Sequence, residues 1–232
     1  MTSPRLLLGA GALAVGALAA RPRLMRWGAT DHDLARPLPG DGLVPGEHGV
    51  TTMATTIPAP PSAIWPWLVQ MGADRGGWYS WDRLDNAGRP SADQVHLDWQ
   101  HLETGDRFTT VPGRAWFEVV HVEPARSLVL RATLDAKGRS LDPAGPQPRW
   151  RTDARWEFFL DPQGDGTTRL LVRSGGAGRP KLLADLANVA FWHPAHVIMQ
   201  ARQFQLLRRR SVELAARRGA RELRHEVAAG TF

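Results

Sequence analysis

The chain has 232 residues, of which 43% are hydrophobic, 22% charged and 8% aromatic, a composition that suits one folded domain with appendages and excludes a disordered chain. The absence of cysteine excludes disulfides, thiolate metal sites and a cysteine nucleophile. The formal net charge of +6 comes without a zinc-finger, helix-turn-helix or RNA-reading motif, so the sequence predicts no nucleic-acid partner.

The N-terminal segment begins with an apolar run, Leu6–Ala20, which is followed by three arginines and preceded by one. A transmembrane helix needs about 20 apolar residues, whereas the core of a signal peptide needs roughly 7–15. Because basic residues gather on the cytoplasmic side of a membrane, the arginines after the run favour an anchor with the domain in the cytoplasm. A cleaved export signal and a soluble helix are the alternatives. We therefore predict that residues 1–27 are an anchor or signal segment and contact a membrane.

The segment 28–49 holds three prolines and several glycines, at a spacing that stops a helix or strand from growing. It is predicted to be a linker, or a strap that lies on the domain. The domain itself is expected over residues 50–218, followed by a C-terminal tail over 219–232.

The domain opens with a β-branched stretch, Val50–Ile57, that predicts a strand ending at Pro58. Prolines then occupy the first turn of a predicted helix, on which apolar residues recur at helical spacing from Ile64 to Met71. A second short helix is expected over residues 82–86.

Five strand-like segments follow, separated by turn residues such as Pro112-Gly113. Strands linked this closely are most economically antiparallel neighbours. They are predicted over residues 107–111, 115–122, 127–134, 154–160 and 168–174.

The last part of the chain is predicted to be helical from about Pro180, with Pro194 either kinking the helix or starting a new one. An apolar stripe that includes Phe204 and Leu207 runs along this helix, and arginines cover much of the rest. This pattern is typical of a helix that lies across a sheet with its back in solvent.

Two stretches carry a resemblance to a known family. The sequence from Thr56 to Leu68 resembles the opening strand and helix of polyketide-cyclase-like and dehydrase-like proteins of the START-like, or SRPBCC, superfamily. The chain is also similar to an uncharacterised bacterial SRPBCC group in the motifs Trp27–Thr30, Pro37–Asp41 and Gln70–Ser80. The resemblance covers about Trp27 to Arg210 and implies an α+β helix-grip fold, in which an antiparallel β-sheet wraps around a long C-terminal helix.

The fold that the resemblance implies leaves a cavity between helix and sheet, and ten tryptophans against one tyrosine supply large apolar side chains for its wall. Filling the core is the alternative role for each of them. The predicted ligand-lining residues are Trp67, Met71, Trp78, Tyr79, Trp116, Trp156, Phe158, Trp192 and Met199.

Three polar residues are candidates for catalysis. Tyr79 could donate a proton, Arg75 could clamp an anionic oxygen, and His196 could help to polarise a carbonyl. Each also has a structural alternative: a hydrogen-bonded core phenol for Tyr79, an ion pair for Arg75, and a structural histidine for His196. No cofactor is predicted, and no metal site, because the pair His193 and His196 lacks a positioned carboxylate.

The leading interpretation is a binding domain for a hydrophobic or amphipathic small molecule. The alternatives are a cyclase-like or dehydratase-like enzyme that acts on a bound carbonyl compound, and a membrane-surface protein whose arginine-rich final helix meets anionic lipid. The sequence leaves open whether the protein is an enzyme.

Overall fold

The computed structural model describes residues 19–142 and 145–229, with side chains described up to residue 225. Residues 19–25 are helical, so most of the apolar run lies outside the described residues. The helices are α2 (Asp31–Ala35), α3 (Pro61–Val69), α4 (Asp82–Asp85), the 3-10 turn η1 (Leu97–Trp99), α5 (Lys181–Ala187), the π-helical η2 (Asn188–Trp192) and α6 (His193–Ala229). The strands are β1 (His48–Ile57), β2 (Arg107–Val111), β3 (Ala115–Glu123), β4 (Ser127–Asp135), β5 (Arg151–Pro162) and β6 (Thr168–Arg179).

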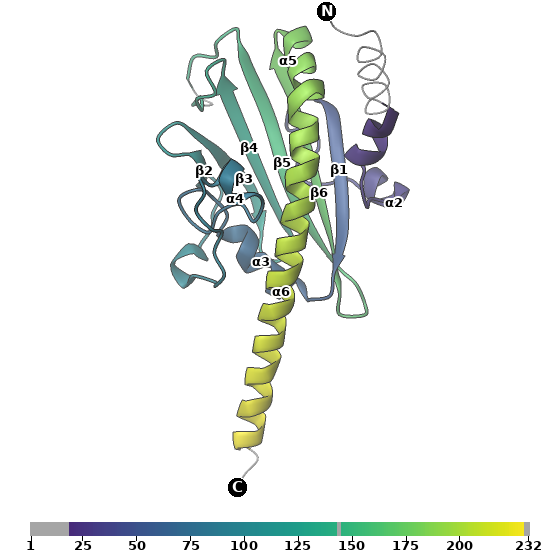
Figure 1. Ribbon diagram of the computed structural model, residues 1–232, viewed down its shortest axis with the longest axis vertical. Helices are drawn as coiled ribbons and strands as arrows, with labels where there is room; N and C mark the ends of the chain where they lie inside the picture. Colours follow the sequence, from purple (N-terminus) through teal and green to yellow (C-terminus); the bar gives the residue numbers. More distant parts are fainter. Residues whose placement is uncertain (1–18, 143–144, 230–232) are drawn as a thin grey trace, which may run out of the picture.

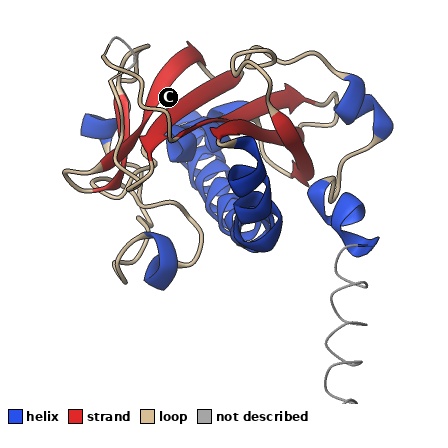
Figure 2. Cartoon of the chain, turned by 90° about the horizontal axis from the view of Figure 1, so that it is seen from above, coloured by secondary structure: helices blue, strands red, loops and turns tan. Residues whose placement is uncertain are grey.

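The six strands form one antiparallel sheet in the order β1-β6-β5-β4-β3-β2, so the first strand pairs with the last. Helices α5 and α6 run along one face of this sheet, and Figure 2 shows the strands curving over the helix. This is the α+β helix-grip architecture that the sequence predicted. We call the face toward the helix concave and the opposite face convex.

The closing helix has the discontinuity that its sequence predicted. A π-helical turn, η2, separates α5 from α6, and Pro194 is the second residue of α6. Proline is tolerated there because the first turn of a helix leaves its N–H groups unpaired. The helix therefore changes from π-helical to α-helical geometry next to Pro194.

The alternation of side chains in β5 separates two faces of the sheet. Phe158 and Leu160 lie in the main core between sheet and helix, whereas Phe159 packs on the convex face against Leu38 and Leu171. Since side chains alternate along a strand, Arg155 and Glu157 share the convex face with Phe159.

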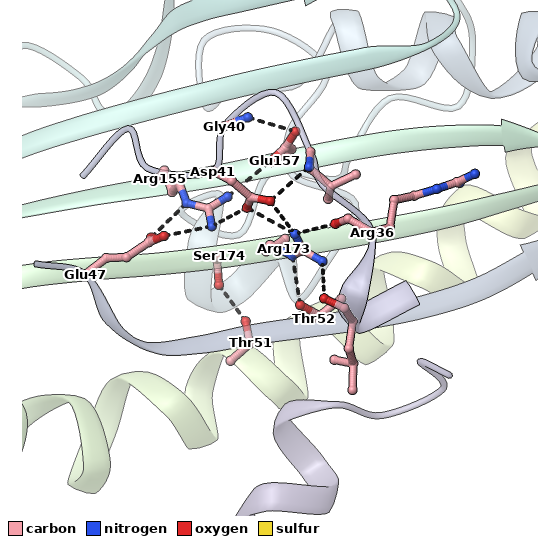
Figure 3. Close-up of polar contacts among 12 residues, drawn as sticks. Arg36, Gly40, Asp41, Glu47, Thr51, Thr52, Arg155, Glu157, Arg173 and Ser174 are labelled. Carbon is pink, nitrogen blue, oxygen red and sulfur yellow. Dashed lines mark hydrogen bonds and ion pairs between the residues drawn. The ribbon is translucent and has the colours of Figure 1, made fainter. Parts of the chain in front are cut away.

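Residues 28–47 lie as a strap on the convex face, and buried arginines hold them (Figure 3). The predicted segment 28–49 is corrected in two respects, because it contains the short helix α2 and its last two residues already belong to β1. Arg155 donates to Glu47 at 2.8 and 3.0 Å, to Asp41 at 2.9 Å and to Glu157 at 3.1 Å. Arg173 donates twice to Asp41, at 3.0 and 2.8 Å. Planar guanidinium groups suit such multiple contacts, because their donors form a fixed fork. The strap is therefore fastened by charge pairs as well as by apolar packing.

Candidate functional site

Aromatic rings fill the concave side where the sequence predicted a hollow. The ring of Trp156 lies 4.8 Å from that of Phe158 and 5.8 Å from those of Trp78 and Phe117, measured between centroids. Trp78 is also 6.1 Å from Phe117. These spacings are those of packed aromatic pairs. These four rings, which lie on the part of the concave side away from α5, are therefore in contact with one another. We call this part the lower concave face and the part toward α5 the upper concave face.

Several of the predicted lining residues belong to this core. Trp67, Met71, Trp78, Tyr79 and Phe158 are buried members of one apolar cluster, and Trp156 packs against it partly buried. Among pockets lined by described residues, the structure has a hollow of about 10 Å³, enough for about one water molecule. That hollow lies over β3 and β4 beside Trp116 and Arg131, outside the space between sheet and helix.

Tyr79 is enclosed rather than directed toward open space. Its side chain is fully buried, and its hydroxyl accepts a hydrogen bond of 2.7 Å from the Gln70 amide. Burial raises the pKa of Tyr79, which keeps the phenol neutral. The Trp67 ring meets its ring edge-on at 5.9 Å. These contacts are those of a structural core tyrosine.

Arg75 is also engaged by its surroundings. Its guanidinium donates to the Arg107 carbonyl at 3.0 Å and lies over the Phe108 ring, 5.3 Å from the centroid. The sequence offered an anion clamp or an ion pair with a nearby aspartate for this residue. The structure instead pairs it with a backbone carbonyl and a ring.

The remaining predicted lining residues are dispersed. Trp116 is corrected to the convex face, because Phe117 and Val119 on the same strand turn toward the core and alternation places Trp116 opposite. There the Arg107 guanidinium lies 4.3 Å from its ring centroid. Trp192 is exposed, so its placement also differs from a cavity wall. Met199 is partly buried, and its carbonyl accepts a hydrogen bond from Ser80.

His196 does lie on the concave side, in a row of polar groups. Its Nε2 is 3.1 Å from the Ser174 hydroxyl, and that hydroxyl is 2.7 Å from the Thr51 hydroxyl. Burial, helped by His193, lowers the pKa of His196 to about 4, so the imidazole is neutral at pH 7. Trp156 approaches it edge to face, with ring centroids 6.4 Å apart. This row is the polar part of the candidate site.

Thr51 and Ser174 were absent from the predicted site. The available signal was strand parity, because Ser174 lies opposite both Thr51 and Trp156 in the sheet and so shares their face. That signal needed the register between β1, β5 and β6, which joins residues more than 100 positions apart.

The concave face changes character beyond this row, toward α5. There the large rings are replaced by mostly small side chains, which we call the small-residue surface. It comprises Ala132, Leu134, Thr152, Ala154, Gly176 and Gly178. Ala132 is buried, and the other five residues are partly or fully exposed.

Helix α5 approaches this surface closely at one edge. A Cβ atom built on Gly178 would lie 2.3 Å from the Cβ of Ala184, so the glycine allows the helix to touch β6. Thr152, next to Gly178 in the sheet, remains exposed. The upper concave face is therefore covered at β6 and accessible at β5. An apolar surface with a few placed polar groups is what small-molecule sites offer.

The chemistry of the described residues gives no sign of a metal site. Among them, no three histidine, aspartate or glutamate side chains come together as a set of metal ligands. The donors at the candidate site are two hydroxyls and one imidazole.

No protein-family model and no curated protein matches the chain. Several solved structures align with it. The hypothetical protein jhp0584 from Helicobacter pylori is 14% identical over 76% of this chain and 96% of that chain, with a TM-score of 0.47. Protein MLL2253 from Mesorhizobium loti is 20% identical over 69% of this chain and 95% of that chain, with a TM-score of 0.39.

A third aligned structure is DynU16, a protein of the dynemicin biosynthetic locus. It is 20% identical over 69% of this chain and 47% of that chain, with a TM-score of 0.41. Likeness at this level transfers no activity, because one fold hosts many functions. The strand order and closing helix described above show that the chain adopts an α+β helix-grip fold.

Proposed function

We propose that the chain binds a hydrophobic or amphipathic small molecule on the small-residue surface, between β4, β5 and the closing helix. The observation that carries the proposal is the exposure of this surface on the face that elsewhere forms the core. An apolar ligand that covers it would be stabilised by about 25 cal/mol for each Å² of apolar surface removed from water.

The polar row at the lower edge of the surface supports an amphipathic ligand. The hydroxyls of Thr51 and Ser174 and the neutral imidazole of His196 can donate or accept hydrogen bonds. The indole nitrogen of Trp156 is enclosed and has no hydrogen-bond partner among the described residues. An unpaired buried N–H costs about 1–3 kcal/mol, and a ligand oxygen that displaced the ring slightly would relieve it.

Binding is a better account of these residues than carbonyl chemistry. Of the three catalytic candidates, Tyr79 is enclosed by Gln70 and Trp67, and Arg75 is bonded to the Arg107 carbonyl. His196 alone lies beside the accessible surface. A cyclase-like reaction would therefore have to proceed with one of the three groups.

The test is to fill the surface without disturbing the core. Thr152→Trp places a large ring on the small-residue surface at an exposed position, and Thr56→Trp makes the same change at an exposed position of β1 on the convex face. The probe is 1-anilinonaphthalene-8-sulfonate, titrated into the full chain and followed by its fluorescence. We expect Thr152→Trp to weaken binding at least tenfold and Thr56→Trp to leave it within twofold of the original.

Native mass spectrometry of the protein purified from its host provides the second measurement. A small molecule that co-purifies with the original chain and is lost from Thr152→Trp supports the proposal. Probe binding that does not saturate, or that both variants weaken equally, would contradict it.

A further inference from the structure

The first half of the closing helix leaves an unusual amount of apolar surface bare. We call the set Leu182, Leu183, Leu186, Val189, Phe191 and Trp192 the apolar face of α5 and η2. Leu182 is 70% exposed, Leu186 58%, Phe191 60% and Trp192 57%. Contiguous exposed apolar patches are rare on monomeric soluble proteins and mark surfaces that contact a partner or a membrane.

The geometry of the helix explains why these side chains are bare. Helix α5 meets the sheet through Ala184, which lies against Gly178. Leu182, Leu186 and Val189 recur at intervals of four and three residues, so they form a stripe beside that contact. The rings of Phe191 and Trp192 meet edge to face, 5.1 Å apart. The face is thus a continuous feature of α5 and η2.

The apolar face lies beside the end of the N-terminal segment. The Arg21 guanidinium is 2.9 Å from Nδ1 of His193, the residue that follows Trp192. Figure 1 shows the helical residues that contain Arg21 close to the start of α6, at the end of the molecule where α5 lies. Residues 19–25, the described end of the N-terminal segment, therefore lie at the same end of the domain as the apolar face.

The charge around the apolar face favours an anionic partner. Arg179 is exposed two residues before α5, and Arg23 is exposed in the same helical segment as Arg21, which contacts His193. The single acidic residue of α5, Asp185, already pairs with Lys181 and His48. Basic residues beside an apolar surface are attracted to anionic lipids. Two copies of this surface would instead bring like charges together.

We propose that the apolar face of α5 and η2 inserts into the surface of an anionic phospholipid bilayer, next to the point where the N-terminal segment leaves the domain. Phe191 and Trp192 suit the boundary between headgroups and acyl chains, where aromatic rings are enriched. The inference goes beyond the proposed ligand binding and does not depend on it. No helix among the described residues is both long and apolar enough to cross a bilayer.

This surface differs from the arginine-rich stretch that the sequence offered for lipid contact. Arg208 donates to the Thr56 carbonyl at 3.2 Å, and Arg209 and Arg210 both pair with Glu213. Those arginines are occupied within the domain. The lipid contact is therefore assigned to the other end of the closing helix.

The lack of cysteine allows a site-specific test in the full chain. Leu186→Cys and Trp192→Cys each receive an environment-sensitive nitrobenzoxadiazole dye, and Leu223→Cys, at an exposed apolar residue near the far end of α6, is the matched control. The labelled chains are reconstituted in vesicles of 70% phosphatidylcholine and 30% phosphatidylserine at low protein density. Brominated acyl chains then serve as quenchers.

We expect bromolipids to reduce the dye emission at least twofold at positions 186 and 192 and by less than a fifth at 223. Vesicles of phosphatidylcholine alone should weaken the quenching at 186 and 192. Equal quenching at all three positions, or none at 186 and 192, would overturn the inference.

A second copy of the chain as the occupant would give a different result. The dye at 186 would then shift with protein density and escape the bromolipids, which also overturns the inference. The difference in 1-anilinonaphthalene-8-sulfonate binding between Thr152→Trp and Thr56→Trp reports on the ligand surface separately. The two proposals can therefore fail independently.

Discussion

Arg155 pairs with three acidic residues on the convex face, Asp41, Glu47 and Glu157. The side chain of Arg155 is 1% exposed and that of Glu157 is 0% exposed, so this ion pair is shielded from water. Burial raises the pKa of Glu157 to about 7, although Arg155 opposes that shift. The positive charge of Arg155 thus stabilises the ionised form of Glu157, which burial separates from water. Removing Arg155 would leave that negative charge buried without a countercharge.

Arg155→Met should lower the free energy of unfolding by about 3–5 kcal/mol at pH 8, because it leaves buried carboxylates without a partner. The loss should be smaller at pH 5.5, where Glu157 is protonated and carries no charge. Urea unfolding at the two pH values measures it. Arg139→Met removes an arginine that is 60% exposed and pairs with Asp135, and it should cost less than about 1 kcal/mol. Equal costs for the two variants would contradict the argument.

His196 makes the opposite contribution to pH dependence. Its folded pKa of about 4 lies below the ordinary value of 6.5, so the unfolded chain binds a proton first as pH falls. Stability from this group is complete above about pH 6.5 and is lost as the pH falls toward 4. His196→Gln should reduce the loss between pH 7.5 and 4.5 by about 1–3 kcal/mol in urea unfolding. The exposed His101, changed to Gln, is the control, and an equal effect there would refute the assignment.

At the scale of elements, the contact between α5 and β6 sets how far the closing helix lies from the sheet. It depends on the missing side chain of Gly178, since a Cβ there would meet Ala184. The small residues beside it keep the upper concave face open. The large rings on the lower part of the same strands close the core.

Gly178→Ala should therefore displace α5 from β6 and destabilise the protein by about 1–3 kcal/mol through overpacking. Hydrogen exchange should become faster across residues 181–187, with α3 unchanged. Gly164→Ala, in the turn between β5 and β6, is the control, because no heavy atom lies within 4 Å of its added Cβ. Unchanged exchange in α5 would show that the contact is not limiting.

At the scale of the whole molecule, local patterns and the family resemblance were enough to predict the fold and too little to predict the site. Turn residues marked the strands, and the resemblance supplied the helix-grip arrangement. Nothing local shows whether aromatic rings line a space or fill it, because that depends on their distances across elements. Trp78 comes from a loop and Phe117 and Trp156 from two different strands, and only their contacts show a packed core.

The convex charge network was missed for a similar reason. Arg155 and Glu157 are polar residues two positions apart in a strand, a pattern that ordinarily means a solvated face. Asp41, a partner of Arg155, lies more than 100 residues earlier, in a segment whose prolines and glycines suggested only a linker or strap. The identity of the partners emerged from the way the strap lies on the sheet.

Helix α6 has 37 residues, which corresponds to about 55 Å at 1.5 Å per residue. It carries its last described residues away from the sheet, to the end of the molecule opposite α5 (Figure 1). The helix therefore acts as a rigid spacer, and a tag or binding partner fused to its last turn would be held several nanometres along its axis from the apolar face of α5 and η2. Its length fixes that separation, so each inserted helical turn should add about 5 Å to it.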